Sequence, residues 1–223
     1  CIRDRSIWND FTITLRQGNV VLWLIAINLG IFILQAFVGM IGFLFMADSA
    51  VFETFYQSYF YAPSSLDSLL YRPWTVLTYV FFHADFWHIL FNLLYLYWFG
   101  RIFQVYHSEK RLLNLYLLGA LVGSAFYIVS YNTFPVFEQA KHQAYLLGAS
   151  GAVWSIIAAA MATNPAYRIR LFIIGSVPLW GIVLFMFGRD LLSFQGNPGG
   201  ILAHFGGMIT GFSFVGLYRR GYN

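Results

Sequence analysis

The sequence predicts an all-α membrane protein whose chain crosses the bilayer several times. Of its 223 residues, 59% are hydrophobic and only 10% carry a charge. A soluble globular domain has about 25% charged residues, so this chain lacks the polar side chains needed to cover a surface in water. Several charge-free apolar runs also approach or exceed the length of roughly 20 residues that spans a bilayer as a helix. Together these observations exclude a soluble domain.

Six apolar spans follow one another along the chain, and no internal repeat or separate soluble domain interrupts them. The fifth span contains Pro178, which a membrane helix tolerates where neighbouring helices satisfy the freed backbone groups. We therefore predict one domain over residues 1–223, with an N-terminal segment at 1–19 and a six-helix core at 20–217. The expected spans are 20–44, 86–103, 112–131, 145–163, 171–187 and 201–217.

The basic residues of the short loops predict the orientation of the chain. Ten of the thirteen Lys and Arg residues fall on one face, which leaves only Arg72, Lys141 and Arg189 on the other. Because an even number of spans returns the chain to the same side, we expect both termini in the cytoplasm and the 45–85 loop outside. For a bacterial source, this describes a multi-pass protein of the inner (plasma) membrane. The scattering of the basic residues argues against nucleic acid as a partner.

Four polar side chains are expected near the outer ends of three helices. His88 and Asn92 lie about two and six residues into the second span, Ser150 about five into the fourth, and His204 about three into the sixth. At roughly 1.5 Å per residue, all four lie within about 10 Å of the outer surface. Polar groups at membrane depth are costly unless they have a partner or a task. Their common depth indicates a single site.

The residue types at this depth favour acyl transfer to a serine. Ser150 has Gly148 and Gly151 close on either side, so a substrate or another backbone can approach it closely. His204 can act as the general base that a serine hydroxyl needs. Glycines three and seven residues after His204 form a stripe, and small residues along the fourth span form another. Two such faces let helices pack closely, which would bring His204 against Ser150.

Donors for a developing oxyanion are available at the same depth. A neutral His88 and the amide of Asn92 both carry N–H groups, and the backbone N–H of Ser150 is a third candidate near a helix start. Taken singly, each of these residues also has a purely structural interpretation, as a packing serine, an interfacial histidine or a small-residue helix contact. Their occurrence together at one depth favours a functional site.

These motifs, in this order, resemble those of the rhomboid family of intramembrane serine proteases. The segment HADFWHILFN from His83 is similar to the family pattern H-x₄-H-x₃-N, GASG at 148–151 to G-x-S-G, and AHFGGMITG at 203–211 to A-H-x-x-G followed by GxxxG. The resemblance extends over about 72–211 and implies a six-helix rhomboid-like bundle. It further implies a Ser–His dyad with Ser150 as nucleophile and His204 as base. His88 and Asn92 would line the oxyanion hole.

The resemblance also assigns supporting roles and contains two departures. His83 would hold the junction between the outer loop and the second helix. Some members carry Trp-Arg in the first loop, whereas here Trp74 is followed by Thr75, so a structural arginine contact at that point is not implied. Many members have Tyr four residues after the serine, stacked on the catalytic histidine; here Trp154 occupies that position and is large enough for the same task.

The implied activity is cleavage of single-pass membrane proteins in or near the outer part of their transmembrane segment. The expected partners are such substrates and the lipid bilayer, and no cofactor or metal is expected. A metalloprotease would need an H-E-x-x-H helix, which the sequence lacks, and the single cysteine, Cys1, cannot form a cysteine-based metal cluster.

Three other classes of protein compete with a serine protease. An aspartyl protease would need two aspartates within the membrane, but Asp85 and Asp190 were expected at span edges. A transporter would show discontinuous helices in two matching halves, which are not evident. The remaining alternative is a catalytically inactive rhomboid-like protein that binds membrane helices without cutting them. Such proteins typically lose the serine or the histidine, and this chain keeps both.

Overall fold

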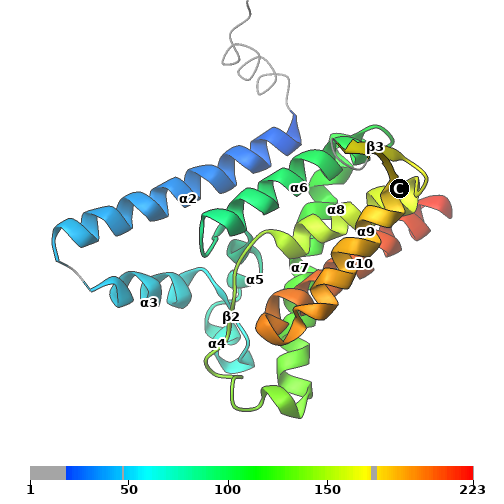
Figure 1. Cartoon of the computed structure of the whole chain (residues 1–223). Coiled ribbons are helices and arrows are strands. Elements are labelled where there is room, and N and C mark those ends of the chain that lie inside the picture. Colours follow the sequence, from blue (N-terminus) through cyan, green and yellow to red (C-terminus); the bar gives the residue numbers. More distant parts are fainter. Residues whose placement is uncertain (1–18, 47, 172–174, 223) are drawn as a thin grey trace, which may run out of the picture.

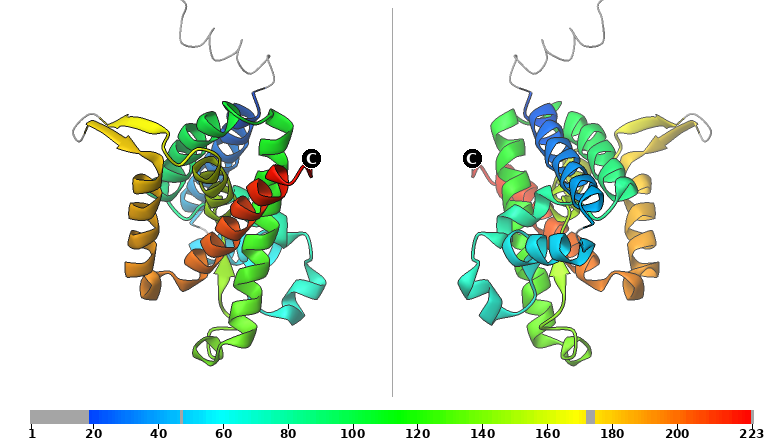
Figure 2. Two further views of the ribbon diagram at one scale, coloured as in Figure 1. Left: turned by 90° about the vertical axis from the view of Figure 1, so that its right-hand side faces the viewer. Right: turned by 90° about the vertical axis from the view of Figure 1, so that its left-hand side faces the viewer.

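The protein is a bundle of helices arranged around one central, buried helix (Figures 1 and 2). The computed structural model describes residues 19–46, 48–171 and 175–222. The central helix is α8 (Ser150–Thr163), in which every residue from Gly151 to Ala160 is buried. Three helices pack around it: α6 (Phe86–Gln104), α7 (Glu109–Thr133) and α10 (Pro198–Arg219). The core of the protein therefore surrounds α8.

The helices confirm a helical membrane bundle. The first predicted span matches α2 (Val20–Leu44) in both bounds, and the second, third and sixth match α6, α7 and α10. Among the described residues, α2, α7 and α10 are long and apolar enough to cross a membrane. The count of six spans and the cytoplasmic termini stay predictions. The N-terminal segment predicted at 1–19 lies outside the described residues except for Asn19, whose side chain caps α2 by accepting a hydrogen bond from the N–H of Val21 at 3.1 Å.

The fourth predicted span begins too early. Its first residues form strand β2 (Tyr145–Leu146), which pairs antiparallel with β1 (Ala62–Pro63) of the outer loop, and α8 starts only at Ser150. Ser150 is therefore the first residue of its helix, not the sixth. Hydropathy alone does not separate a short apolar strand from the first turn of an apolar helix.

The fifth predicted span is wrong over its first part. The predicted span begins at the last residue of strand β3 (Arg168–Leu171), which pairs with β4 (Gly175–Pro178), and helix α9 (Leu179–Leu192) begins only after Pro178. The ring of proline fixes φ and removes the backbone N–H, which suits a position just before a helix better than one inside it. The β-branched apolar residues of this segment suit a strand as well as a membrane helix, so the sequence pattern was ambiguous.

The outer loop is folded rather than extended. It contains α3 (Ser49–Tyr59), α4 (Leu66–Tyr71), α5 (Thr75–Thr78) and a 3₁₀ turn, η1 (Tyr79–Phe81). Arg72 stabilises it by donating two hydrogen bonds to the carbonyl oxygens of Gln57 and Ser58, at 3.0 and 2.7 Å. Trp74 donates its indole N–H to the carbonyl oxygen of Tyr59 at 2.8 Å. Arg72 therefore makes a structural contact within this loop. In the Trp-Arg pair of other members the arginine follows the tryptophan, whereas Arg72 precedes Trp74.

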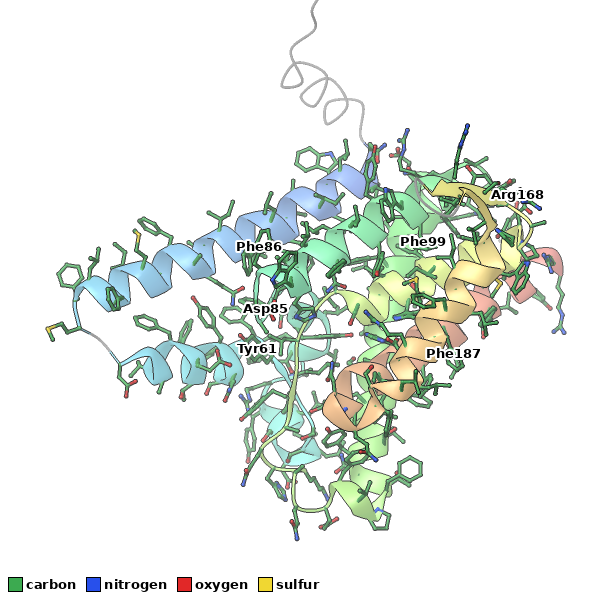
Figure 3. All side chains as sticks on the ribbon, viewed as in Figure 1. Tyr61, Asp85, Phe86, Phe99, Arg168 and Phe187 are labelled. Carbon is green, nitrogen blue, oxygen red and sulfur yellow. The ribbon has the colours of Figure 1, made fainter. Side chains whose placement is uncertain are left out.

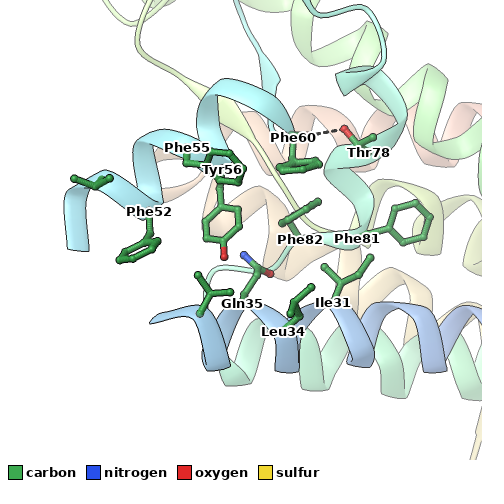
Figure 4. Close-up of a pocket in the computed structure, with 12 residues that line it drawn as sticks. Ile31, Leu34, Gln35, Phe52, Phe55, Tyr56, Phe60, Thr78, Phe81 and Phe82 are labelled. Carbon is green, nitrogen blue, oxygen red and sulfur yellow. Dashed lines mark hydrogen bonds between the residues drawn. The ribbon is translucent and has the colours of Figure 1, made fainter. Parts of the chain in front are cut away.

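An apolar groove separates α3 from α2 at one edge of the protein (Figure 4). Its volume is about 640 Å³, and most of its lining side chains are aromatic or aliphatic. Figure 4 shows Ile31 and Leu34 of α2 on one side and Phe55 of α3 on the other, with Phe82 between them. This edge of the molecule is loosely packed, in contrast to the surroundings of α8.

Candidate active site

Five of the eight predicted site residues line one cavity inside the bundle, whereas His83, Gly148 and Gly151 are not among its lining residues. His88 and Asn92 of α6, Ser150 and Trp154 of α8, and His204 of α10 all border a space of about 310 Å³. Asp85 and Phe86, labelled in Figure 3, mark the end of α6 at which this cavity lies. Residues from three helices, separated by more than a hundred positions in sequence, therefore meet at one place.

Ser150 is held at the start of α8 by the glycine turn before it. Gly148 has φ +108°, a conformation that side chains other than glycine rarely adopt. A Cβ atom at Gly148 would lie 2.6 Å from the imidazole of His88, so only glycine fits there. The N–H of Gly148 donates to the carbonyl oxygen of Tyr79 at 3.0 Å, which fixes the turn against the outer loop.

The helix that begins at Ser150 has no side-chain cap. The first N–H groups of any α-helix have no acceptor within the helix, and the helix dipole makes this end favourable for negative charge. The preceding residue, Ala149, donates its N–H to Nε2 of His83 at 3.4 Å. The backbone N–H of Ser150 is one of these first N–H groups of α8.

His83 lies in the loop before α6. Burial lowers the pKa of its imidazole to about 3, and the neighbouring His88 is the second cause that lowers it. A neutral ring has one nitrogen free to accept a hydrogen bond, in keeping with the bond from Ala149. The rings of His83 and His88 meet edge to face, with centroids 5.0 Å apart. His83 thus connects the outer loop, the start of α6 and the turn before Ser150.

Hydrogen bonds at the start of α6 orient His88 and Asn92. Asp85 caps the helix, its Oδ1 accepting a bond from the N–H of His88 at 2.9 Å. Nδ1 of His88 accepts a bond from the N–H of Ala84 at 3.4 Å, which leaves Nε2 to carry the ring proton. The amide of Asn92 donates one hydrogen to the carbonyl oxygen of His88 at 2.9 Å. The Nε2–H of His88 and the second amide hydrogen of Asn92 are therefore available to a bound group.

His204 is buried in α10 between a tryptophan and a carboxylate. The ring of Trp154 packs against it with centroids 5.8 Å apart, so the tryptophan contacts the histidine as the family resemblance implies for this position. On its other side, Nδ1 of His204 lies 2.6 Å from Oδ2 of Asp190, near the end of α9. No direct hydrogen bond joins the side chains of Ser150 and His204 among the described residues.

Asp190 is a neighbour of His204 that the sequence motifs do not indicate. The sequence predicts it at the edge of a span, yet Asp190 is 1% exposed. Its contact with His204 depends on how α9 and α10 fold back on each other, which no motif records. The available signal was the pair Arg189-Asp190 in the last turn of an apolar segment, where charged residues are rare.

Small residues bring α8 and α10 into close contact, as predicted. A Cβ at Gly207 would lie 3.2 Å from Cβ of Trp154, and one at Gly211 would lie 2.8 Å from Cβ of Ala158. At both positions the backbone of α8 is closer still. Since any side chain would push the two helices apart, the glycines set the spacing between the helix that carries Ser150 and the helix that carries His204.

No group of three or more His, Cys, Asp or Glu side chains is arranged to hold a metal ion in the part of the chain that the structure describes. The absence of a metal or cofactor stays a prediction.

Comparison with known proteins agrees with the motifs and the cavity. A family model described as "Rhomboid domain" matches residues 71–221, which include every residue of the candidate site. The chain belongs to the rhomboid family. It is also 29% identical over 229 residues to the "RHOMBOID-like protein 12, mitochondrial" of Arabidopsis thaliana. This match takes in 98% of the chain but only 64% of the relative's length. As a rhomboid with several long apolar helices, the protein is an integral membrane protein.

Proposed function

We propose that this rhomboid protein is an intramembrane serine endopeptidase that cleaves single-pass membrane proteins in or near the outer part of their transmembrane segment. The supporting observation is the shared cavity. Ser150, the candidate nucleophile, and His204, the candidate base, border it together with His88 and Asn92. Serine, imidazole and several N–H donors around one cavity are the groups that acyl transfer requires.

In the proposed reaction, Oγ of Ser150 attacks the carbonyl carbon of the scissile bond while Nε2 of His204 takes the hydroxyl proton. His204 then gives this proton to the leaving amine, and a water molecule repeats the sequence on the acyl-enzyme. The oxyanion would receive hydrogen bonds from Nε2–H of His88, the amide of Asn92 and the N–H of Ser150. The hydrogen bond between Ser150 and His204 would form with substrate bound, since catalytic hydrogen bonds are often long in free enzymes.

The cavity also supports a membrane substrate. Besides its polar groups it is bordered by large apolar side chains, which include Trp87, Phe91 and Met186. A peptide bond within a helix is shielded by its own hydrogen bonds, so a substrate needs glycine, proline or polar residues that unwind it locally. No metal takes part in this scheme. With the orientation expected from the basic residues, the cavity opens toward the outer face, which is the periplasmic side of the inner membrane for a bacterial source.

The alternative is an inactive rhomboid-like protein that binds membrane helices without cleaving them. The lack of a direct bond between Ser150 and His204 favours this alternative, and the word "RHOMBOID-like" in the relative's name is compatible with it. Retention of both candidate catalytic groups favours the protease.

Labelling with a fluorophosphonate tests the proposal, because this probe reacts with an activated serine. The purified protein in detergent should be labelled at Ser150, as located by peptide mapping, and Ser150→Ala should abolish labelling. Ser213→Ala changes an exposed serine of α10 and should leave labelling unchanged. Absence of labelling in the folded wild-type protein, together with no cleavage of a model transmembrane substrate, would favour the inactive alternative.

A further inference from the structure

A buried carboxylate contacts the face of His204 that the proposed reaction does not use. Asp190 lies in the last turns of α9, and α10 follows after a short connection at 193–197. Its Oδ2 is 2.6 Å from Nδ1 of His204, and its Oδ1 accepts a hydrogen bond from Arg189 at 2.9 Å. Both oxygen atoms therefore have partners although the residue is almost fully buried.

This contact determines which nitrogen of His204 carries the proton. Asp190 is a carboxylate whose other oxygen, Oδ1, accepts a hydrogen bond from Arg189. Because a carboxylate only accepts hydrogen bonds, Nδ1 of His204 must donate the hydrogen to Oδ2. The neutral ring then has its lone pair on Nε2, the nitrogen that a general base uses. Because His204 also borders the cavity that contains Ser150, the two ring nitrogens have separate tasks: Nδ1 holds Asp190, and Nε2 is free to receive a proton.

We propose that Asp190 is a positioning residue for His204, so that the site acts as a Ser–His–Asp triad instead of the Ser–His dyad expected from the family resemblance. This inference rests on the proposed function. When the proton of Ser150 Oγ passes to Nε2 of His204, the ring becomes a cation, and the carboxylate of Asp190 stabilises it. The proton continues to the leaving amine, and Asp190 stays ionised throughout.

A competing explanation treats the same contact as a tether that holds α9 against α10. Few other residues of α9 are buried (Leu179, Val183 and Met186), so a polar anchor near its end would be useful for packing alone. The two explanations differ in what they require of Asp190. A tether needs only a hydrogen bond to Nδ1, which an amide oxygen can accept, whereas a positioning residue also needs the negative charge.

Asp190→Asn separates these explanations, since it keeps the size and an acceptor oxygen but removes the charge. We expect kcat for a model transmembrane substrate to fall by up to about 10⁴, the loss that Asp→Asn causes in a serine protease triad. KM and the unfolding temperature in detergent should stay near the wild-type values. The matched control is Asp67→Asn, the same change at an exposed residue of the outer loop, which should leave kcat unchanged. Wild-type kcat in Asp190→Asn would overturn the proposal.

A second measurement does not depend on the folding of Asp190→Asn. In wild-type protein labelled with ¹⁵N-histidine, NMR should find His204 as the Nδ1–H tautomer, assigned by the loss of its signals in His204→Gln. The Nε2–H tautomer would overturn the proposal even if Asp190→Asn cannot be purified. The two proposals fail separately: an unlabelled, inactive wild-type protein refutes the protease, whereas an active wild type with an equally active Asp190→Asn refutes only the triad.

Discussion

Helices α2 and α10 are both apolar and long enough to cross a membrane, yet they are packed in opposite ways. In its most apolar stretch, 56% of α10 is buried inside the protein, against 17% of α2. The glycines of α10 contact the backbone of α8, whereas at Gly30 and Gly39 of α2 an added Cβ would meet no atom within 4 Å. Hydrophobicity is thus enough to place a helix in the membrane, but close contact between helices needs small residues at matching positions.

This difference separates the molecule into a tightly packed bundle, which contains the candidate site, and a peripheral edge. In the bundle of α6, α7, α8 and α10, glycines bring helix backbones into close contact. Buried serines away from the cavity, such as Ser124 and Ser155, donate their hydroxyl groups to backbone carbonyl oxygens. At the edge formed by α2 and α3, large side chains face outward and border an open groove (Figure 4). Substitutions in the bundle should therefore have larger effects than equivalent substitutions at the edge.

The largest expected effect is the loss of cleavage in Ser150→Ala and in His204→Ala. If these residues act as one nucleophile–base unit, either change disables the same step, so the double variant should be no slower than each single one. Cleavage of a model transmembrane substrate measures the effect, with thermal unfolding in detergent as the control. Cleavage by a folded Ser150→Ala variant would show that the nucleophile is another residue.

A smaller loss is expected for Asn92→Ala. Removal of one oxyanion donor typically lowers kcat by about 10²–10³, and His88 and the N–H of Ser150 would continue to donate. The variant should therefore retain activity above that of Ser150→Ala. Single-turnover cleavage rates measure the difference, and complete inactivity at an unchanged unfolding temperature would contradict the assigned role.

The packing contrast is tested by the same substitution in the two helices. Gly207→Ala places a methyl group against the backbone of α8 and should destabilise the protein by about 1–3 kcal/mol, the usual range for overpacking. Gly30→Ala adds a methyl group where space is free, and by helix propensity it should be neutral or stabilising by up to about 1 kcal/mol. Denaturant unfolding in mixed micelles measures both. Equal effects would mean that α8 and α10 are not held by the contact described.

The smallest effect is expected at the peripheral groove. Phe55 is 49% exposed and contacts the rings of Tyr59 and Phe60. Aromatic contacts contribute about 0.5–1.5 kcal/mol each beyond burial, so Phe55→Ala should lower stability modestly and leave kcat within about twofold. A fall in kcat comparable to that of Asn92→Ala would indicate that the groove takes part in substrate handling.

Much of this architecture could be predicted because its determinants are local. The bounds of α2 follow from an uninterrupted apolar run, and the glycine stripe of α10 is visible as a spacing in the sequence. Asp190 could not be predicted, because its contact with His204 arises only when α9 folds back on α10. The β3–β4 hairpin was missed for a different reason: an apolar β-branched segment is compatible with both a strand and a membrane helix.

The pairing of β1 with β2 couples the outer loop mechanically to Ser150. Leu146 pairs with Ala62 of the loop, and only three residues separate it from Ser150. A displacement of the outer loop at this point, for example by an arriving substrate, is transmitted to the serine through a chain segment too short to absorb it. The resting position of Ser150 therefore depends on the outer loop, through a strand pair whose residues Ala62 and Leu146 are both buried.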